Sequence, residues 1–252
     1  MRASVYQGFL VMRVPRCFEA QPLMVGHEIE LNPTNHQHLN RALRMAVGGA
    51  LRLFNNSGQD YCAEVVHTDK KSTLVRITEA LALPTESPVQ VHIGLGMSLG
   101  DRMEYAIQKA TEAGVVAITP LETERSELRL KGDRAEKKHA RWQQVAISAA
   151  EQCYRAQVPE IHPVMSLRDW VNTPSTACKL VLHHEHAQRL AEHTKPEFVR
   201  ALIGPEGGLS DSDLTVAYAA DFAPVALGPR VLRTETAPVV LLAAINTLWG
   251  DY

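Results

Sequence analysis

Two glycine-bearing segments near the end of the chain carry the residues best suited to hold a small ligand. Leu202–Ser210 reads Leu-Ile-Gly-Pro-Glu-Gly-Gly-Leu-Ser, and Leu227–Ala237 reads Leu-Gly-Pro-Arg-Val-Leu-Arg-Thr-Glu-Thr-Ala. Each follows a strand-like run and leads into a helical pattern, and ligands of open α/β sheets bind beyond the carboxyl ends of strands. Gly204, Gly208 and Gly228 have no Cβ, so the backbone there can approach a ligand closely. The two segments predict one pocket walled by backbone.

The residues around the glycines argue against two common ligand classes, nucleoside triphosphates and dinucleotides. A phosphate-binding loop needs a lysine and a hydroxyl after its last glycine, whereas Gly208 is followed by Leu209 and Ser210. The spacing of Gly204 and Gly207 also differs from that of the dinucleotide fingerprint. A tight turn with Ser210 as the N-cap of the next helix is the structural alternative for this segment.

Several motifs, in the same order along the chain, resemble a bacterial family of ribosomal RNA methyltransferases. That family methylates N3 of a uridine in 16S (small-subunit) ribosomal RNA and belongs to the knotted SPOUT class of S-adenosylmethionine-dependent enzymes. The likeness extends from about residue 12 to the end of the chain. The motifs that carry it are Met12–Arg16, His38–Met45, Ile118–Ser126, Glu151–Arg155, Pro159-Glu160, Gly204–Gly208 and Leu227–Ala237.

The resemblance implies a fold, a cofactor and partners. The implied fold is α/β, a SPOUT-type knotted parallel sheet with helices on both faces, preceded by a small PUA-like β-barrel that binds RNA. The implied cofactor is S-adenosylmethionine, and the implied partner is 16S ribosomal RNA within the small ribosomal subunit. SPOUT relatives build their site between two subunits, so a homodimer is expected. An apolar face of the last helix suits either a dimer contact or intramolecular core: Val239, Val240, Leu242, Ala243 and Leu248.

The resemblance places the cofactor against three loops in the second half of the chain. They are the loop after the strand that ends in Leu182–Glu185, the loop Gly204–Gly208 and the loop Leu227–Leu232. The first loop is the least typical, because His184-Glu185 stands where a proline or a small residue is common in the family. Backbone groups and apolar side chains of the loops are expected to hold adenine. The implied cofactor-binding residues are Leu182, His183, Ile203, Gly204, Pro205, Glu206, Gly207, Gly208, Leu227, Gly228, Val231, Leu232, Thr236 and Ala237.

Two charged residues after the second glycine segment are the candidates for catalysis. Methyl transfer from a sulfonium is an in-line displacement, so the protein mainly aligns the reactants. Uracil N3 also carries a proton that must leave, which requires a base or a stabiliser of the uracil anion. Arg233 is suited to donate hydrogen bonds to a uracil carbonyl or a phosphate. Glu235 is suited to accept the N3 proton or to hold Arg233 by a charge-assisted hydrogen bond. Alternatively, Glu235 is an acid favoured by the dipole at the start of the last helix.

Cations of two regions are predicted to contact RNA. His38, Arg41 and Arg44 stand three apart, close to one helical stripe. Their alternative is an ordinary stripe of solvated charge, and the alternative for the later positions is surface charge of a helix or loop. The predicted set is Arg13, Arg16, His38, Arg41 and Arg44 in the first domain, with Arg125, Gln152 and Arg155 in the second.

A metal site is not expected. His183, His184, Glu185 and His186 are consecutive, and neighbouring side chains of a strand point to opposite faces. The 4 cysteines are scattered without a Cys-x-x-Cys pair, which fits neither zinc nor a disulfide framework. Such cysteines fit a reducing cytoplasm, and no run approaches the roughly 18–20 apolar residues that span a bilayer.

The hydropathy patterns predict two domains joined by a linker. Residues 1–11 are interpreted as an extension before a natural start at Met12, with a genuine short tail as the alternative. Residues 12–83 show one helical pattern at 36–45 and strand patterns at 47–54, 61–66 and 73–78, with a hairpin turn signal at Asn55–Gly58. Residues 84–88 form the linker, and 89–252 the methyltransferase domain.

Strand and helix patterns alternate through residues 89–252, which indicates a parallel sheet with helices on both faces. Strands are predicted at 89–97, 115–119, 179–183, 199–203 and 223–227, and helices at 101–113, 133–156, 186–193, 211–220 and 238–249.

Two other functions stay open at this point. One is a related SPOUT enzyme acting on another ribosomal or transfer RNA nucleotide, because the motifs define the cofactor better than the base. The other is a non-catalytic RNA-binding assembly factor. The near balance of 26 basic and 28 acidic residues means that any RNA-binding surface must be local.

Overall fold

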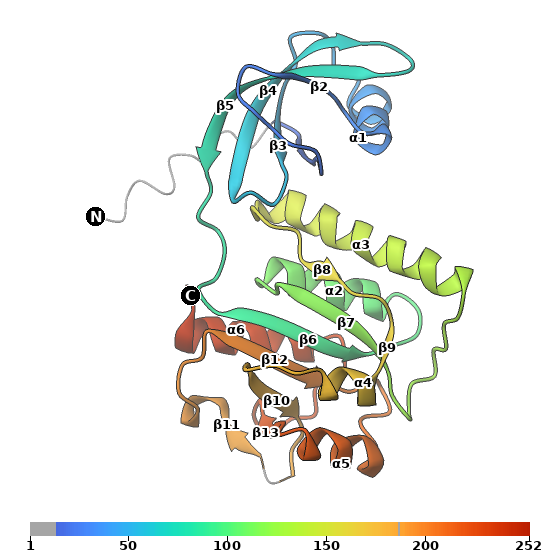
Figure 1. Cartoon of the computed structure of the whole chain (residues 1–252), viewed down its shortest axis with the longest axis vertical. Helices are drawn as coiled ribbons and strands as arrows, with labels where there is room; N and C mark the ends of the chain where they lie inside the picture. Colours follow the sequence, from blue (N-terminus) through green and yellow to red (C-terminus); the bar gives the residue numbers. More distant parts are fainter. Residues whose placement is uncertain (1–13, 186) are drawn as a thin grey trace. The chain divides into compact units, whose positions relative to one another are not determined.

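The computed structural model describes residues 14–185 and 187–252, and it divides into two compact units (Figure 1). One unit holds residues up to 85 together with 154–157, and the other holds 86–153 with 158–252. Residues 154–157 therefore group with the first unit, which the sequence pattern did not predict. The expected start at Met12, the extension 1–11 and Arg13 lie outside the described residues.

The first unit is built on a five-stranded mixed sheet. Its strands in spatial order are β1 (Arg16–Phe18), β3 (Ala50–Phe54), β4 (Gln59–Thr68), β5 (Thr73–Ala82) and β2 (Glu28–Glu30). β1 and β3 are parallel and the other pairs are antiparallel. The hairpin expected at Asn55–Gly58 is confirmed, with left-handed Asn56 (φ 64°) and Gly58 (φ 78°) in the turn.

The closed barrel expected for this unit is not what the described residues show. Closure would require the first and last strands of the sheet to pair. Here β1 and β2 are the two edges, at opposite ends of the strand order, and each has only three residues. The sheet is open and mixed.

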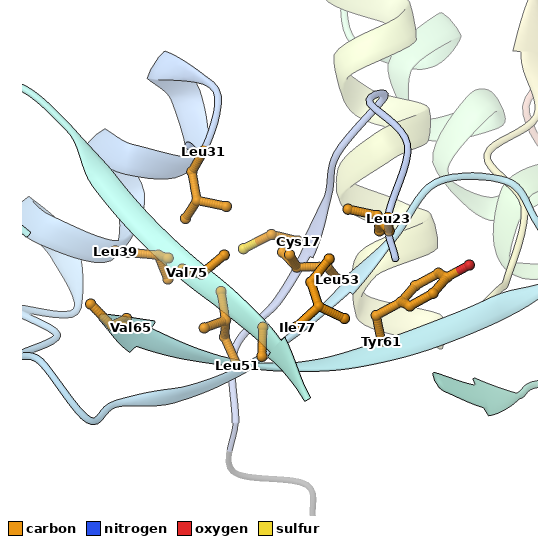
Figure 2. Close-up of a cluster of buried hydrophobic side chains, with 11 residues drawn as sticks. Cys17, Leu23, Leu31, Leu39, Leu51, Leu53, Tyr61, Val65, Val75 and Ile77 are labelled. Atoms are coloured by element: carbon orange, nitrogen blue, oxygen red, sulfur yellow. The ribbon is translucent and has the colours of Figure 1, made fainter. Parts of the chain in front are cut away.

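The core of the first unit lies on one face of this sheet (Figure 2). Alternate residues of the central strands point into it, as the period of two requires, for example Leu51 and Leu53 on β3 and Val75 and Ile77 on β5. Leu39 packs onto the same cluster from the helical segment. The strand patterns predicted at 47–54, 61–66 and 73–78 correspond to β3, β4 and β5.

The helical segment of the first unit is shorter than expected. It consists of α1 (Pro33–Gln37), capped by the Asn32 side chain, and a π-helical turn, η2 (His38–Ala42). The predicted helix to residue 45 is wrong in its last part, because Arg44 adopts a left-handed conformation with φ 49°.

The second unit contains an eight-stranded sheet whose recorded pairs are all parallel, as expected. The spatial order is β11 (Gln188–Arg189), β13 (Ala223–Ala226), β10 (Cys178–Leu182), β12 (Phe198–Ile203), β6 (Gln90–Gly96), β7 (Ala117–Glu122) and β8 (Glu160–Ile161), with β9 (Met165–Ser166) also on β7. The helix predicted at 186–193 is wrong: β11 and a 3-10 turn, η3 (Leu190–Glu192), occupy its described residues.

Helices cover both faces of this sheet (Figure 1). α2 (Arg102–Glu112) packs against α3 (Asp133–Cys153) and α6 (Ala237–Trp249). On the other face, α4 (Leu167–Asn172) and α5 (Asp211–Ala219) share a core in which Trp170 meets Leu202 and Phe222. The α/β expectation is confirmed, although α4 was missed because six residues are too few to show a helical period. No helix of the described residues is long and apolar enough to span a membrane.

A half-buried histidine lies on the α4 side of the sheet. The Nε2 atom of His92 on β6 is 2.8 Å from the Thr119 hydroxyl, and its ring meets Trp170 edge to face. Arg200 of β12 donates hydrogen bonds to the carbonyls of Trp170 and Thr173 at the end of α4. Burial foremost, then the charges of His162 and Arg200, lowers the pKa of His92 to about 3.

Candidate functional site

A cavity of about 660 Å³ opens at the carboxyl ends of three neighbouring strands of the second unit. Leu182 ends β10, Ile203 ends β12 and Ala226 ends β13, and all three residues line the cavity. β10 lies between β12 and β13, so parallel pairing brings the three strand ends to one edge. The sequence placed a pocket at this edge, and the cavity confirms that placement.

The structure brings together nearly all of the residues that were predicted to bind the cofactor. Thr236 is the exception, because it lines a second, adjoining cavity. Their role as cofactor ligands stays a prediction. The predicted residues that line the first cavity are Leu182, His183, Ile203, Gly204, Pro205, Glu206, Gly207, Gly208, Leu227, Gly228, Val231, Leu232 and Ala237.

The first glycine loop is shaped by close backbone contacts. The Gly208 N–H donates to the Pro205 carbonyl at 2.8 Å, and Gly208 has a φ of +70°, which favours glycine. A Cβ at Gly204 would lie 3.0 Å from the Leu209 nitrogen. A Cβ at Gly96, the last residue of β6, would lie 2.4 Å from the Pro205 nitrogen. Gly96 thus allows the loop to rest on β6, a role that its position at a predicted strand end hinted at.

Glu206 of this loop is held by the segment that begins α2. Its Oε1 atom accepts from Arg102 Nη1 at 2.7 Å and from the Leu99 N–H at 3.2 Å. Burial raises the pKa of Glu206, but hydrogen bonds from its own backbone N–H and from Arg102 outweigh burial, so the pKa lies below its ordinary value. The Glu206 carboxylate therefore holds the loop in place. Neither Leu99 nor Arg102 was identified from the sequence.

Arg125 also contacts the glycine loop. Its Nη1 atom donates to the Gly207 and Leu209 carbonyls, each at 3.2 Å, and its side chain lines the cavity. The predicted RNA contact thus lies at the wall of the pocket. Ser210 forms a capping box with Asp213 at the start of α5, which confirms the N-cap expected there. The loop is therefore both a helix cap and a pocket wall.

The two catalytic candidates lie together at the edge of the cavity. Arg233 Nη1 and Glu235 Oε1 are 3.9 Å apart, an ion pair longer than a hydrogen bond. The Arg233 side chain is 81% exposed, whereas that of Glu235 is only 15% exposed. The Arg233 carbonyl accepts the N–H groups of Thr236 and Ala237, which fixes this turn to the start of α6. A ligand in the cavity can thus be reached by the guanidinium.

A second cavity of about 810 Å³ adjoins the first. The two share Arg102, Arg233 and Glu235 in their linings. The remaining lining residues of the second cavity are Leu99, Gly100, Asp101, Tyr105, Glu127 and Thr236.

The two described histidines of the sequence cluster do not alternate as expected. His183 and His184 stack with ring centroids 5.4 Å apart and an interplanar angle of 14°. The strand rule does not apply to them, because β10 ends at Leu182 and the pair belongs to the following loop. His186 lies outside the described residues. Over the described chain, no group of three or more His, Cys, Asp or Glu side chains is arranged to hold a metal.

Two of the cations that were predicted to contact RNA are buried. Arg16 is 8% exposed, and its Nη2 atom donates to Asp60 Oδ1 and to the Arg155 carbonyl, each at 2.7 Å. Its guanidinium also lies 3.7 Å from the centroid of the Phe54 ring. Arg155 is 3% exposed. Such burial and pairing suit a structural role for Arg16 and Arg155, and their contact with RNA stays a prediction.

The other predicted RNA contacts remain on the surface. His38, Arg41, Arg44 and Gln152 are exposed, and the first two belong to the π-helical turn. Arg44 departs from the expected helical stripe because its backbone is left-handed. The RNA-facing role of this exposed set stays a prediction.

Comparisons with known proteins point to one family. A family model described as an RNA methyltransferase domain matches residues 85–246. A ribosomal RNA small subunit methyltransferase E from Buchnera aphidicola is 31% identical and aligns over 95% of this chain and 96% of that relative.

Two solved structures resemble nearly the whole chain. A methyltransferase from Legionella pneumophila, in complex with the bound cofactor SAM, has a TM-score of 0.92 and 36% identity, covering 95% of this chain and 100% of that one. A ribosomal RNA small subunit methyltransferase E from Neisseria gonorrhoeae, bound to S-adenosyl methionine, has a TM-score of 0.89 and 35% identity, with the same coverage of 95% and 100%.

Proposed function

Because this chain belongs to the RNA methyltransferase family, among the ribosomal RNA small subunit methyltransferases E, we propose that it methylates N3 of a uridine in 16S ribosomal RNA. The methyl donor is S-adenosylmethionine, and the substrate RNA belongs to the small ribosomal subunit in the cytoplasm. The observation that carries the proposal is the cavity formed by both glycine segments, with Arg233 and Glu235 at its edge.

The residues of the first cavity fit the proposed cofactor. A volume of about 660 Å³ lies within the range of about 300–1,000 Å³ that is typical of small-molecule sites. Apolar Leu182, Ile203, Leu227 and Leu232 suit the faces of adenine, and the backbone of Gly204–Gly208 suits its polar edge. When bound, S-adenosylmethionine supplies an electrophilic methyl group.

Arg233 and Glu235 are suited to manage the charge of the acceptor. As uracil N3 loses its proton, negative charge spreads to the carbonyl oxygens, and a guanidinium at the cavity edge stabilises it. Glu235 is mostly buried and lies 3.9 Å from Arg233, so it orients the guanidinium or accepts the N3 proton. No covalent intermediate with the protein is needed for an in-line displacement.

The knotted SPOUT arrangement belongs to the same proposal. β13 is the last strand in sequence, yet it lies between β10 and β11. The knot would form if the chain that enters β13 and continues to α6 threads through the loop that joins β10 to β11. Threading of this kind is rare, so strand order alone would not predict it. A PUA-like, RNA-binding character is proposed for the open sheet of the first unit.

A homodimer through α6 is the assembly that we propose. Val239, Val240 and Ala243 are half-buried and Leu248 is 44% exposed, so they leave an apolar strip for a second copy. Leu242 was expected on this strip but is only 1% exposed, and it therefore serves the core of its own unit.

Deleting the gene and reading the RNA tests the proposed function in cells. A methyl group on N3 blocks the pairing edge of uracil, so reverse transcription of 16S ribosomal RNA should stop at one uridine in wild-type cells and read through in the deletion. Restoring the wild-type gene should restore the stop. Identical profiles in wild-type and deletion cells would exclude this substrate. Loss of a methyl mark at another nucleotide would support the related enzyme, and unchanged methylation with defective subunit assembly would support the assembly factor.

A further inference from the structure

We propose that the second cavity receives the target uracil and that Tyr105 stacks on its face. This inference rests on the proposed function, since it names where the acceptor of that reaction binds. The cavity measures about 810 Å³ and is lined by Leu99–Arg102, Tyr105, Glu127, Arg233, Glu235 and Thr236.

The position of this cavity meets the geometric demand of methyl transfer. An in-line displacement requires the accepting atom to lie directly beside the donated methyl group, with the reacting atoms about 3–3.5 Å apart. An acceptor site must therefore share a wall with the donor site. Arg102, Arg233 and Glu235 line both cavities, and they provide that shared wall.

Tyr105 provides the stacking surface that single-stranded RNA bases use. Recognition of an unpaired base commonly relies on an aromatic side chain under its face. Tyr105 is 49% exposed, and it is the one Phe, Tyr or Trp among the described residues that line either cavity. Its N–H donates to the Asp101 carbonyl at 2.9 Å, so the first turn of α2 fixes its backbone.

The charged lining matches the pairing edge of uracil. That edge presents a carbonyl, an N–H and a second carbonyl, and it requires two donors flanking an acceptor. Arg102 and Arg233 contribute donors to the lining, and the carboxylates of Glu235 and Glu127 contribute acceptors. Cytosine has no proton on N3, so a carboxylate that faces N3 would have no donor there, and its amino group would face an arginine, which is also a donor. The lining therefore favours uracil.

Substitution of Tyr105 tests the proposal with two activity readouts. Tyr105→Ala should lower kcat/KM for small subunits about tenfold or more, because stacking on the ring is removed. Tyr105→Phe keeps the ring and should stay within about twofold of wild type, on the same stacking argument. The dissociation constant for S-adenosylmethionine, measured by calorimetry, should be unchanged in both variants. Tyr218→Ala is the matched control, since Tyr218 is a similarly exposed tyrosine (41%) on α5.

Several results would overturn the proposal. Wild-type kinetics of Tyr105→Ala would do so, as would an equal loss of activity in Tyr105→Phe, which would assign the role to the hydroxyl. Dissociation of a dimer in Tyr105→Ala, seen by light scattering, would place Tyr105 against a second copy instead.

Photo-crosslinking separates this inference from the proposed function. 16S ribosomal RNA carrying 5-iodouridine should crosslink to the peptide that contains Tyr105, and the crosslink needs no catalysis. A crosslink at Tyr105 without any methyl transfer would refute the activity and retain the base site. Methyl transfer with crosslinks only to other peptides would refute the base site and retain the activity.

Discussion

Arg233 is the single residue on which the proposed chemistry depends most. Its side chain is 81% exposed beside Glu235, at the wall shared by the two cavities. Arg233→Ala should lower kcat by about 10²–10³, because a preorganised charge next to the developing uracil anion is removed. Affinity for S-adenosylmethionine should change little. Single-turnover methylation and calorimetry measure the two effects, and Arg168→Ala, an exposed arginine of α4, is the control. Parallel losses of activity in Arg233→Ala and Arg168→Ala would assign the effect to general charge.

His92 predicts how stability depends on pH. Its pKa is about 3 in the folded protein against an ordinary value of 6.5, so between these values the unfolded chain binds a proton that the folded chain does not. The free energy of unfolding should therefore fall as pH decreases below 6.5, with this residue contributing up to about 1.4 kcal/mol per pH unit.

Urea unfolding at several values between about pH 7 and pH 5 measures this slope. His92→Gln should flatten it, and His38→Gln, at an exposed position, should leave it unchanged. An unaltered slope in His92→Gln would show that other groups cause the pH dependence.

Residue type alone did not separate functional cations from structural ones. Arg16 and Arg125 were both assigned to RNA, yet Arg16 is buried against Asp60 and Arg125 holds the glycine loop. A guanidinium can serve any of these roles, and the groups that contact it in the folded protein determine which role it has. The glycines were predictable because Gly204 and Gly208 stand where the backbone allows little else.

At the scale of elements, the ion pair between Glu206 and Arg102 joins the glycine loop Gly204–Gly208 to the start of α2. Glu206→Gln should weaken S-adenosylmethionine binding about two- to fivefold, since partly exposed ion pairs contribute modestly. Arg102→Ala should have a similar effect, and the double variant should be no worse than either single variant. Calorimetry measures the affinities, with Glu112→Gln as the control for a second ion pair on α2. Fully additive effects would show that the two residues act independently.

The packing of β6 against the glycine loop gives a steric prediction. Gly96→Ala would place a Cβ 2.4 Å from the Pro205 nitrogen, a backbone atom that cannot move aside cheaply. The substitution should lower the free energy of unfolding by about 1–3 kcal/mol and weaken cofactor binding as the loop shifts. Urea unfolding and calorimetry report the two effects. Unchanged values for both would mean that the loop position is not set by Gly96.

The sequence pattern predicted only those helices and strands that are long enough to show a hydropathy period. α3 and β12 are long enough to show their periods, and both were predicted. β8, β9 and β11 have two residues each and show no period at all. For that reason the segment around β11 was interpreted as a helix.

For the whole molecule, a net charge of −2 means that RNA affinity must come from local cations. Arg41 and Arg44 are exposed in the first unit. The double substitution to Ala should reduce the slope of log affinity against log salt by about 0.7 for each RNA phosphate that is no longer neutralised. Filter binding of 16S ribosomal RNA between about 50 and 200 mM salt measures this slope. A slope equal to that of wild type would remove Arg41 and Arg44 from the RNA surface.

The overall architecture was predictable only in part. Alternating strand and helix patterns predicted the α/β class, because such alternation has few packed solutions. The hydropathy pattern could not predict that β13 lies between β10 and β11, because the order of strands in a sheet depends on contacts between residues far apart in sequence. For the same reason, the sequence did not predict that residues 154–157 group with the first unit.

Methyl transfer with purified components tests the central claim most directly. The protein is mixed with methyl-labelled S-adenosylmethionine and small ribosomal subunits from cells that lack it, and the digested nucleosides are identified by mass spectrometry. The account predicts label in 3-methyluridine alone, at one 16S position, and labelling that is about 10²–10³ slower with Arg233→Ala. Label in another nucleoside, or no label from a protein that binds the cofactor, would contradict it.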